Sequence, residues 1–242
     1  MQNVFKDTFT VRSYESSPDK FVSIPSICNY FQESAWKHAE ELGLGFKSLA
    51  DRNLYWVLTK FIISLESLPG WGETAEVHTW PKGKKGFYAL RDFLLLLPGG
   101  TVSAKASSAW IVLNTETLRP VHLDFTDAIL NYSTGDPALD WDFAKIPQSG
   151  ENLAQIPITV TYSDLDVNNH VNNVNYIKWV LDLFYPLFPE REIRSLEMHY
   201  IAEALFRDNL MLSISSAEKP DSFIFECLRH RDNKTIFRGI IR

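Results

Sequence analysis

The chain has 242 residues and a formal net charge of −6, which argues against a general nucleic-acid binder. It contains 7 Trp and 16 Phe, so it can bury a large core or enclose an apolar ligand, and no apolar run is long enough to span a bilayer. Its two cysteines, Cys28 and Cys227, lie far apart and in no metal-binding spacing, which fits a reducing compartment.

The first half of the chain has the pattern of a strand, a helix and further strands. Residues 5–14 alternate like a strand. Pro25 then opens a helix that Gly43 ends. Its apolar residues at helical spacing are Ile27, Phe31, Ala35, Ala39 and Leu42. Strand-like runs follow at residues 54–65, 75–79, 87–97 and 102–113, with Pro98-Gly99-Gly100 predicting a hairpin turn.

The second half repeats this order. A strand is predicted at residues 156–162, and a helical stripe ends near Pro186 and Pro189. The stripe consists of Val174, Ile177, Leu181 and Phe184. Further strands are predicted at residues 195–205, 210–217, 222–229 and 235–241. The acidic, weakly periodic stretch 118–157 between the halves is interpreted as a solvated crossover on the surface.

A strand, a helix and about four antiparallel strands, occurring twice, predict an α+β fold of the tandem (double) hot-dog type. In that fold, two antiparallel sheets are each wrapped around a long central helix. We expect an N-terminal hot-dog at residues 1–131, a linker at 132–154 and a C-terminal hot-dog at 155–242.

The segment at residues 166–176 is the most informative one, with one carboxylate, five asparagines and a histidine at the mouth of the second predicted helix. Asn favours turns and N-caps, but five exceed what one cap requires. One interpretation is an elaborate helix entry with a structural histidine. The other is a site where an amide, an imidazole and a carboxylate meet near a helix N-terminus, which favours developing negative charge.

Residues 163–173, followed by Tyr176-Ile177, resemble the signature of the acyl-acyl-carrier-protein (acyl-ACP) thioesterases that end fatty-acid synthesis. Further similar runs stand in the same order at residues 56–60, 71–77, 79–80, 90–93 and 108–114. These matches cover most of the chain. The resemblance implies hydrolysis of a fatty acyl-ACP thioester without a cofactor, and it names acyl carrier protein and the acyl chain as partners.

The resemblance also assigns roles to site residues. Glu203, within the strand predicted at 195–205, is the leading base or water-positioning group, with an outward-facing strand glutamate as the alternative. Asn168 would donate to the oxyanion and Asp166 would orient Asn168 and the nearby backbone. His170 would share the activation of water with Glu203, and the sequence does not divide that duty between them.

The two halves differ where this chemistry would take place. We align the halves by pairing Tyr30 with Tyr176 and Trp71 with Phe206. In this alignment the first half has apolar or unrelated residues opposite the site. The pairs are Lys20, Val22 and Ile24 opposite Asp166, Asn168 and His170, and Leu68 opposite Glu203. We therefore expect the N-terminal half to accommodate the acyl chain and the C-terminal half to cleave the thioester.

The chain departs from the family at one position. Many plant members carry Cys directly after the glutamate, where this chain has Ala204. Neither Cys28 nor Cys227 substitutes for it in sequence. The sequence therefore predicts attack by water, or through a carboxylate, and no acyl-cysteine intermediate.

Contacts to substrate and carrier are predicted from the first half. The residues expected to contact the acyl chain are Trp56, Leu58 and Trp71. The residues expected to dock the acidic carrier are Lys82, Lys84, Lys85 and Arg91, in a stretch without an acid. The alternative for these cations is a set of solvated hairpin ends.

Rival interpretations stay open. Asp164, Asp166 and His170 could in principle bind a metal, but their Asn-rich surroundings favour hydrogen bonding instead. A hot-dog acyl-CoA thioesterase and a non-catalytic acyl-binding protein are the alternative functions, and a homodimer is possible. Residues 1–6 lack the features of a signal or transit peptide, so we expect a cytoplasmic protein, with a bacterial source favoured over a plastid one.

Overall fold

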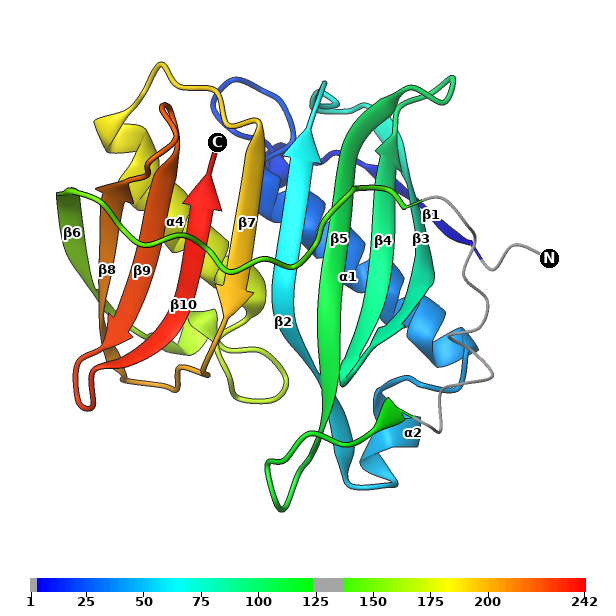
Figure 1. Cartoon of the computed structure of the whole chain (residues 1–242). Coiled ribbons are helices and arrows are strands. Elements are labelled where there is room, and N and C mark those ends of the chain that lie inside the picture. Colours follow the sequence, from blue (N-terminus) through cyan, green and yellow to red (C-terminus); the bar gives the residue numbers. More distant parts are fainter. Residues whose placement is uncertain (1–3, 124–136) are drawn as a thin grey trace. The chain divides into compact units, whose positions relative to one another are not determined.

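The computed structural model describes residues 4–123 and 137–242. Its contacts divide the chain into two compact units, Met1–Asp142 and Phe143–Arg242 (Figure 1). The boundary predicted at 131 and the first part of the predicted linker 132–154 lie outside the described residues. Within the described ranges, no helix is both long and apolar enough to cross a membrane.

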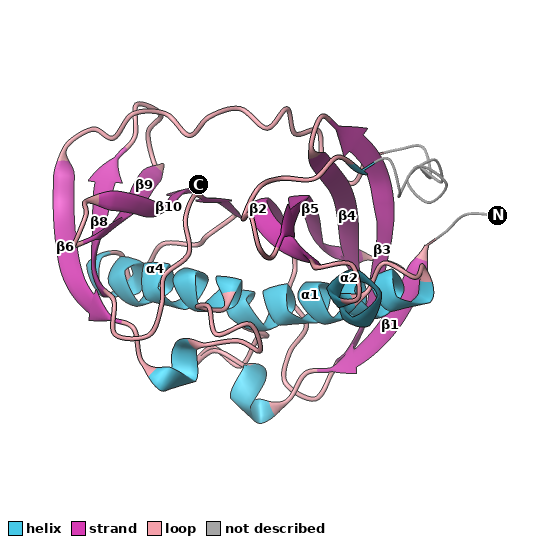
Figure 2. Ribbon diagram, turned by 90° about the horizontal axis from the view of Figure 1, so that it is seen from below, coloured by secondary structure: helices cyan, strands magenta, loops and turns pink. Residues whose placement is uncertain are grey.

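The first unit is an antiparallel sheet with one long helix against a face (Figure 2). Its helices are α1 (Ile24–Glu41) and α2 (Phe46–Ala50), with a 3₁₀ turn at Ser13–Glu15. Its strands are β1 (Phe5–Thr10), β2 (Leu54–Leu65), β3 (Thr74–Lys85), β4 (Tyr88–Leu96) and β5 (Val102–Asn114). In space the strands follow the order β1-β3-β4-β5-β2.

The second unit has the same design. Its helix is α4 (Asn173–Leu187), with a 3₁₀ turn at Tyr162–Asp164. Its strands are β6 (Asn152–Thr159), β7 (Ser195–Tyr200), β8 (Asn209–Ser216), β9 (Phe223–Arg229) and β10 (Lys234–Ile241). They are antiparallel and follow the order β7-β10-β9-β8-β6. The predicted α+β fold with a helix-bearing sheet in each half is confirmed.

Local sequence signals explain the helix ends. The Ser23 side chain caps α1 with Pro25 in its first turn, and Gly43 takes a φ of +70° just past its end. Helix α4 starts after Asn172, whose side chain accepts from the Val174 N–H, and Pro186 lies in its last turn. The predicted turn at Gly99 and Gly100 has positive φ at both residues.

The core of each unit lies between its helix and its sheet. In the first unit, Phe31 of α1 stacks on Phe93 of β4 at 4.9 Å. In the second, Phe184 of α4 contacts Phe225 of β9, and Tyr176 contacts Phe237 of β10. Each buried side chain of this size contributes roughly 1.5–3 kcal/mol, so the apolar helix stripes account for the packing.

Two predictions were wrong, one about the end of a strand and one about the stretch between the halves. Strand β7 ends at Tyr200, because the N–H groups of Ile201 and Ala202 both donate to the carbonyl of Ile236 and the ladder cannot continue. Glu203 therefore stands in an irregular segment and not within a strand. The stretch 143–150 is also more than a solvated crossover, since Ile146 is buried in a cluster with Ile224 and Ile240.

Candidate active site

A tight turn between the 3₁₀ turn and α4 carries the motif residues. Oδ1 of Asp166 accepts the N–H of Asn168 at 2.8 Å and that of His170 at 3.2 Å. The N–H of Asp166 in turn donates to the carbonyl of His170 at 2.8 Å, and Asn169 takes a φ of +60°. Asp166 therefore organises the backbone of this turn, because its carboxylate satisfies two N–H groups that face it.

The imidazole of His170 meets the carboxylate of Glu203. Nε2 of His170 lies 2.8 Å from Oε2 of Glu203, and the two side chains are 32% and 48% exposed. A backbone hydrogen bond from the Val171 N–H to the Ala204 carbonyl, at 3.2 Å, joins the two segments directly beside this pair. The sequence-based expectation that these side chains converge is thus met, although Glu203 arrives from a loop.

The amide of Asn168 is open to a ligand. This side chain is exposed, and it has no hydrogen-bond partner among the residues that the structure describes. The contact from Asp166 reaches the backbone N–H of Asn168 and leaves its side-chain amide unrestrained. Asn168 stands two residues before His170 in the same turn, so this turn carries both an exposed amide and the imidazole that meets Glu203.

Neither cysteine is placed as a nucleophile. Both are buried, and burial raises the pKa of Cys227 to about 12 and raises that of Cys28 as well. A thiol with such a pKa is protonated at neutral pH and reacts poorly. Ala204, directly after Glu203, is fully buried.

The first unit repeats the turn with different side chains. The bridge between Leu165 and Val171 matches the one between Ser16 and Val22, and the N-caps Asn172 and Ser23 match in the same register. The alignment on Tyr30 and Tyr176 was therefore wrong by three residues. The residues in the places of Asp166, Asn168 and His170 are Ser17, Asp19 and Phe21. The first unit still lacks the polar set.

Leu68 does stand in the place of Glu203, as predicted. The N–H of Val22 donates to the carbonyl of Pro69 at 2.9 Å, just as the N–H of Val171 donates to that of Ala204. Pro69 therefore corresponds to Ala204, and Leu68, which precedes Pro69, corresponds to Glu203.

The residues predicted to contact the acyl chain have different environments. The indole N–H of Trp56 donates to the Leu44 carbonyl at 2.9 Å, and its ring packs on the core cluster around Leu49. Leu58 is buried, whereas Trp71 is exposed in the turn that follows β2. Trp56 thus has a structural contact that explains its presence, and acyl-chain contacts by these three residues stay a prediction.

The four predicted docking cations divide into two pairs. Arg91 donates to Nδ1 of His38 and to the Thr79 hydroxyl, both at 3.1 Å, and burial lowers its pKa to about 10. Lys82 lies 3.4 Å from the buried Asp92. These contacts inside the unit argue against docking by Arg91 and Lys82, whereas Lys84 and Lys85 are exposed near the β3–β4 turn.

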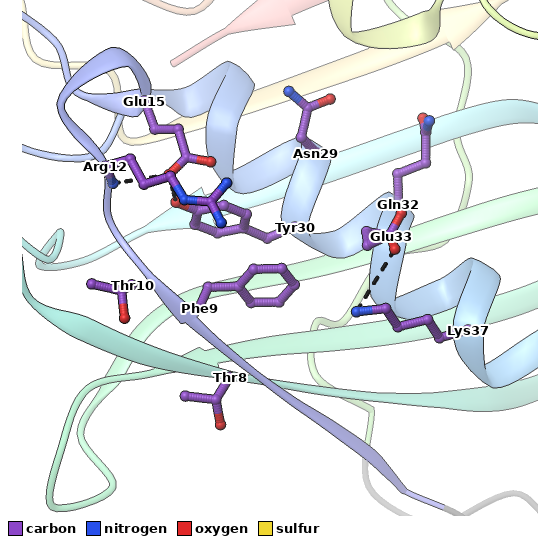
Figure 3. A pocket seen from close by; sticks show the side chains of 10 residues that line it. All are labelled: Thr8, Phe9, Thr10, Arg12, Glu15, Asn29, Tyr30, Gln32, Glu33 and Lys37. Carbon is purple, nitrogen blue, oxygen red and sulfur yellow. Dashed lines mark hydrogen bonds and ion pairs between the residues drawn. The ribbon is translucent and has the colours of Figure 1, made fainter.

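A surface pocket of about 590 Å³ lies between β1 and α1 (Figure 3). The Phe9 ring stacks on Tyr30 at 4.3 Å, and the Tyr30 hydroxyl donates to Glu15 at 2.7 Å. Most of its other lining is polar, including Lys37 paired with Glu33. A polar lining of this kind does not suit a fatty acyl chain.

No group of three or more His, Cys, Asp or Glu side chains in the described part of the chain is arranged to hold a metal ion.

Comparisons with known proteins match both units. The family model for the acyl-ACP thioesterase N-terminal domain matches residues 2–130, and that for the acyl-ACP thioesterase C-terminal domain matches residues 148–239. Chloroplastic palmitoyl-acyl carrier protein thioesterases of Cuphea hookeriana and Arabidopsis thaliana are each 33% identical, over 89% and 98% of this chain. The chain spans 55% and 63% of the length of these two relatives.

Solved structures agree with these matches. An acyl-ACP thioesterase from Bacteroides thetaiotaomicron has a TM-score of 0.88 at 26% identity, over 99% of this chain and 97% of that one. The 12:0-ACP thioesterase from Umbellularia californica has a TM-score of 0.87 at 26% identity, over 100% of this chain and 97% of that one.

Proposed function

Because the chain belongs to the acyl-ACP thioesterase family, we propose that it hydrolyses the thioester of a fatty acyl-acyl-carrier protein. The products would be free fatty acid and the carrier thiol, which ends chain elongation. The observation that carries this proposal is the 2.8 Å contact between His170 and Glu203. The turn that contains His170 also contains the exposed Asn168. These residues lie in the unit that matches the family's C-terminal domain.

Water is a weak nucleophile, so a base must take its proton as the oxygen attacks the thioester carbon. Glu203, paired with His170, is the group we assign to this step, with His170 holding the water or sharing the proton. The C–S bond then breaks, and the departing thiolate takes up a proton. Thiolate is a good leaving group, so the site needs little acid assistance.

The carbonyl oxygen becomes an oxyanion during the attack and must be stabilised. We assign this role to the side-chain amide of Asn168, because it is exposed and has no partner within the described residues. Asp166 would keep Asn168 in place through the backbone N–H that it accepts. One donor of this kind typically lowers the barrier by about 3 kcal/mol.

The two units would divide the work. The first unit lacks the polar set and would accommodate the acyl chain, with Trp56, Leu58 and Trp71 as candidate contacts. Lys84 and Lys85 would attract the acidic carrier protein. We also retain a bacterial cytoplasmic location and a possible homodimer as predictions. Light scattering of the purified protein tests the second.

The direct test is hydrolysis of a purified acyl-ACP by wild type and by Glu203→Gln, with release of fatty acid measured by mass spectrometry. We expect a loss of activity of about 10²- to 10⁴-fold, since the amide cannot accept a proton. Glu226→Gln is the matched control, because Glu226 is also a partly buried, ion-paired glutamate of the second unit. Full activity of the Glu203→Gln variant would refute the assigned role.

Two other functions share the fold. An acyl-CoA thioesterase would hydrolyse the CoA and carrier forms of one fatty acid at similar rates, whereas we expect preference for the carrier form. A non-catalytic acyl-binding protein would bind the acyl chain equally well after Asn168→Ala or Glu203→Ala and release no product. Comparing both substrates and both variants in one assay separates the three functions.

A further inference from the structure

The position of the Glu203 carboxylate depends on an irregular segment. Glu203 lies beyond the end of β7, where no ladder of strand hydrogen bonds fixes the backbone. Its side chain is about half exposed, so packing alone does not hold it. The carboxylate nevertheless lies at hydrogen-bond distance from His170. Contacts other than a strand ladder must therefore hold this segment.

The peptide group between Glu203 and Ala204 is held at both ends. Its carbonyl, which belongs to Glu203, accepts from Nη1 of Arg229 at 3.1 Å. Its N–H, which belongs to Ala204, donates to the hydroxyl oxygen of Tyr176 at 3.2 Å. Because a peptide group is planar, fixing both ends also fixes the position of the Cα of Glu203, from which its side chain reaches His170.

Both holding side chains are themselves fixed. Arg229, at the end of β9, is 7% exposed and forms two contacts to Asp232, at 3.0 and 2.7 Å. It also lies 3.5 Å from Asp208. Tyr176, in α4, is 3% exposed with its ring against Phe237, and burial raises its pKa, so its hydroxyl stays protonated. We refer to Tyr176 and Arg229 as the Glu203 clamp.

The first unit provides an internal comparison, because it forms the same segment. The N–H of Gly70 donates to the Glu73 carboxylate at 2.7 Å, and the N–H of Leu205 donates to that of Asp208 at 3.0 Å. Two further hydrogen bonds of this segment also occur in both units. In the first, the N–H of Gly72 donates to the Val11 carbonyl, as the N–H of Arg207 does to the Val160 carbonyl. In the second, the N–H of Val11 donates to the Glu73 carbonyl, as the N–H of Val160 does to the Asp208 carbonyl. The shape of the segment therefore does not require the clamp.

The clamp is missing from that first copy. Pro69 takes the place of Ala204 and has no N–H to hold. Ile27, the fourth residue after the N-cap of α1, takes the place of Tyr176. Extending the register of β3 and β4 puts Leu97 in the place of Arg229. The clamp accompanies the carboxylate and is absent where Leu68 replaces it.

We propose that Tyr176 and Arg229 are positioning residues that aim the Glu203 carboxylate at His170. This inference rests on the proposed function, in which Glu203 acts on water. The clamp residues touch the backbone of Glu203 and act through it. Weakening the clamp should therefore misplace the carboxylate while leaving substrate binding intact.

Tyr176→Phe tests the clamp with the smallest change in shape, and Arg229→Lys is a second variant that retains the positive charge beside Asp208 and Asp232. We expect kcat on acyl-ACP to fall by about ten- to a hundredfold with little change in KM, since misplacement by about 1 Å can cost that much. In a Glu203→Gln background, neither substitution should lower kcat further. Tyr30→Phe, which removes a part-buried, hydrogen-bonded hydroxyl from α1, should leave kcat unchanged.

A second readout does not depend on activity. The ring ¹⁵N resonances of His170, assigned with a His170→Gln variant, should move in both clamp variants towards their positions in Glu203→Gln. Unchanged resonances, or a loss of kcat that persists in the Glu203→Gln background, would overturn the clamp. An active Glu203→Gln variant would instead refute the role that the proposed function assigns to Glu203, and a wild type without acyl-ACP hydrolysis would refute the function itself. The His170 resonances would still decide on the clamp.

Discussion

The side-chain amide of Asn175 donates to the backbone carbonyl of Asp164 at 2.9 Å and ties the first turn of α4 to the 3₁₀ turn before it. Asn175 is buried, and Asn172 caps the same helix. These two asparagines have structural tasks, whereas Asn168 is exposed with no such contact in the described part of the chain. The helix-entry interpretation therefore accounts for Asn172 and Asn175 but not for Asn168, to which we assign the proposed oxyanion role.

This division predicts opposite effects for two alanine substitutions. Asn168→Ala should lower kcat by about a hundredfold, because an oxyanion donor is lost, with little change in the free energy of unfolding. Asn175→Ala should lower the free energy of unfolding by about 0.5–1.5 kcal/mol, because the Asp164 carbonyl loses one of its two donors and keeps the N–H of Asn172, while the folded enzyme keeps most of its kcat. Urea denaturation and acyl-ACP hydrolysis measure the two effects.

A third variant provides the control for this pair. Asn209→Ala removes an exposed asparagine that bonds to Thr159 in the same unit, and it should leave kcat unchanged. Equal kcat for Asn168→Ala and Asn209→Ala would contradict the oxyanion role.

Much of the fold follows from short-range signals. Strand β2 was predicted at residues 54–65, where it is found, because a long β-rich run lies between turn-forming segments. Helix α1 follows from Pro25 at its start and Gly43 after its end. The helix α2 was not predicted, since five residues are too few to show a helical period.

The errors arise where long-range hydrogen bonds decide the structure. The apolar alternation after Ser195 continues to Leu205, but the single carbonyl of Ile236 accepts two N–H groups and ends the strand early.

The misaligned repeat has a related cause. Tyr30 and Tyr176, each on the buried face of its helix, suggested a match, but the true register differs by three residues. Because three residues are close to one helical turn, both tyrosines still lie on the buried face.

The site itself was only partly accessible from the sequence. The asparagine-rich turn is a local feature, whereas the meeting of His170 with Glu203 was expected only from the family resemblance. Neither Tyr176 nor Arg229 was given a positioning role from the sequence. A signal was present for Arg229, since an arginine at a strand end with Asp232 three residues later often forms a fixed ion pair.

The two buried cysteines predict that turnover needs no thiol on the enzyme. Burial raises the pKa of both thiols, so a Cys28→Ala/Cys227→Ala variant that folds should keep its kcat on acyl-ACP within about twofold. Wild-type enzyme quenched during turnover should carry no acyl group on either cysteine. Detection of such an adduct by peptide mass spectrometry would contradict direct attack by water.

The contact between the buried His38 and the half-buried Arg91 predicts a loss of stability in mild acid. Burial, with the charge of Arg91, lowers the pKa of His38 to about 4 from its ordinary value near 6.5. The guanidinium donates to Nδ1, which must therefore be unprotonated. Below pH ~6.5 the imidazole of His38 is protonated in the unfolded chain but stays neutral in the folded protein. The free energy of unfolding therefore falls as the pH falls towards ~4.

The full effect of this one group is about 3 kcal/mol between those two pH values. Urea denaturation from pH 4.5 to 7 measures it. A His38→Gln variant should lose less stability over this range than wild type, because it has no imidazole to protonate. His230→Gln, which alters an exposed histidine, should follow the wild-type curve. A His38→Gln curve parallel to that of wild type would contradict the assignment.

The placement of Lys84 and Lys85 at an exposed turn predicts a selective effect on the carrier-bound substrate. A Lys84→Glu/Lys85→Glu variant should raise KM for acyl-ACP by about tenfold at low salt, because it removes attraction to an acidic surface. Its kcat/KM for a small acyl thioester should be unchanged. The matched control is Lys47→Glu/Lys219→Glu, which changes two other exposed lysines and alters the net charge equally. An equal loss in both double variants would assign the effect to overall charge, and an equal loss on both substrates would remove docking at this turn.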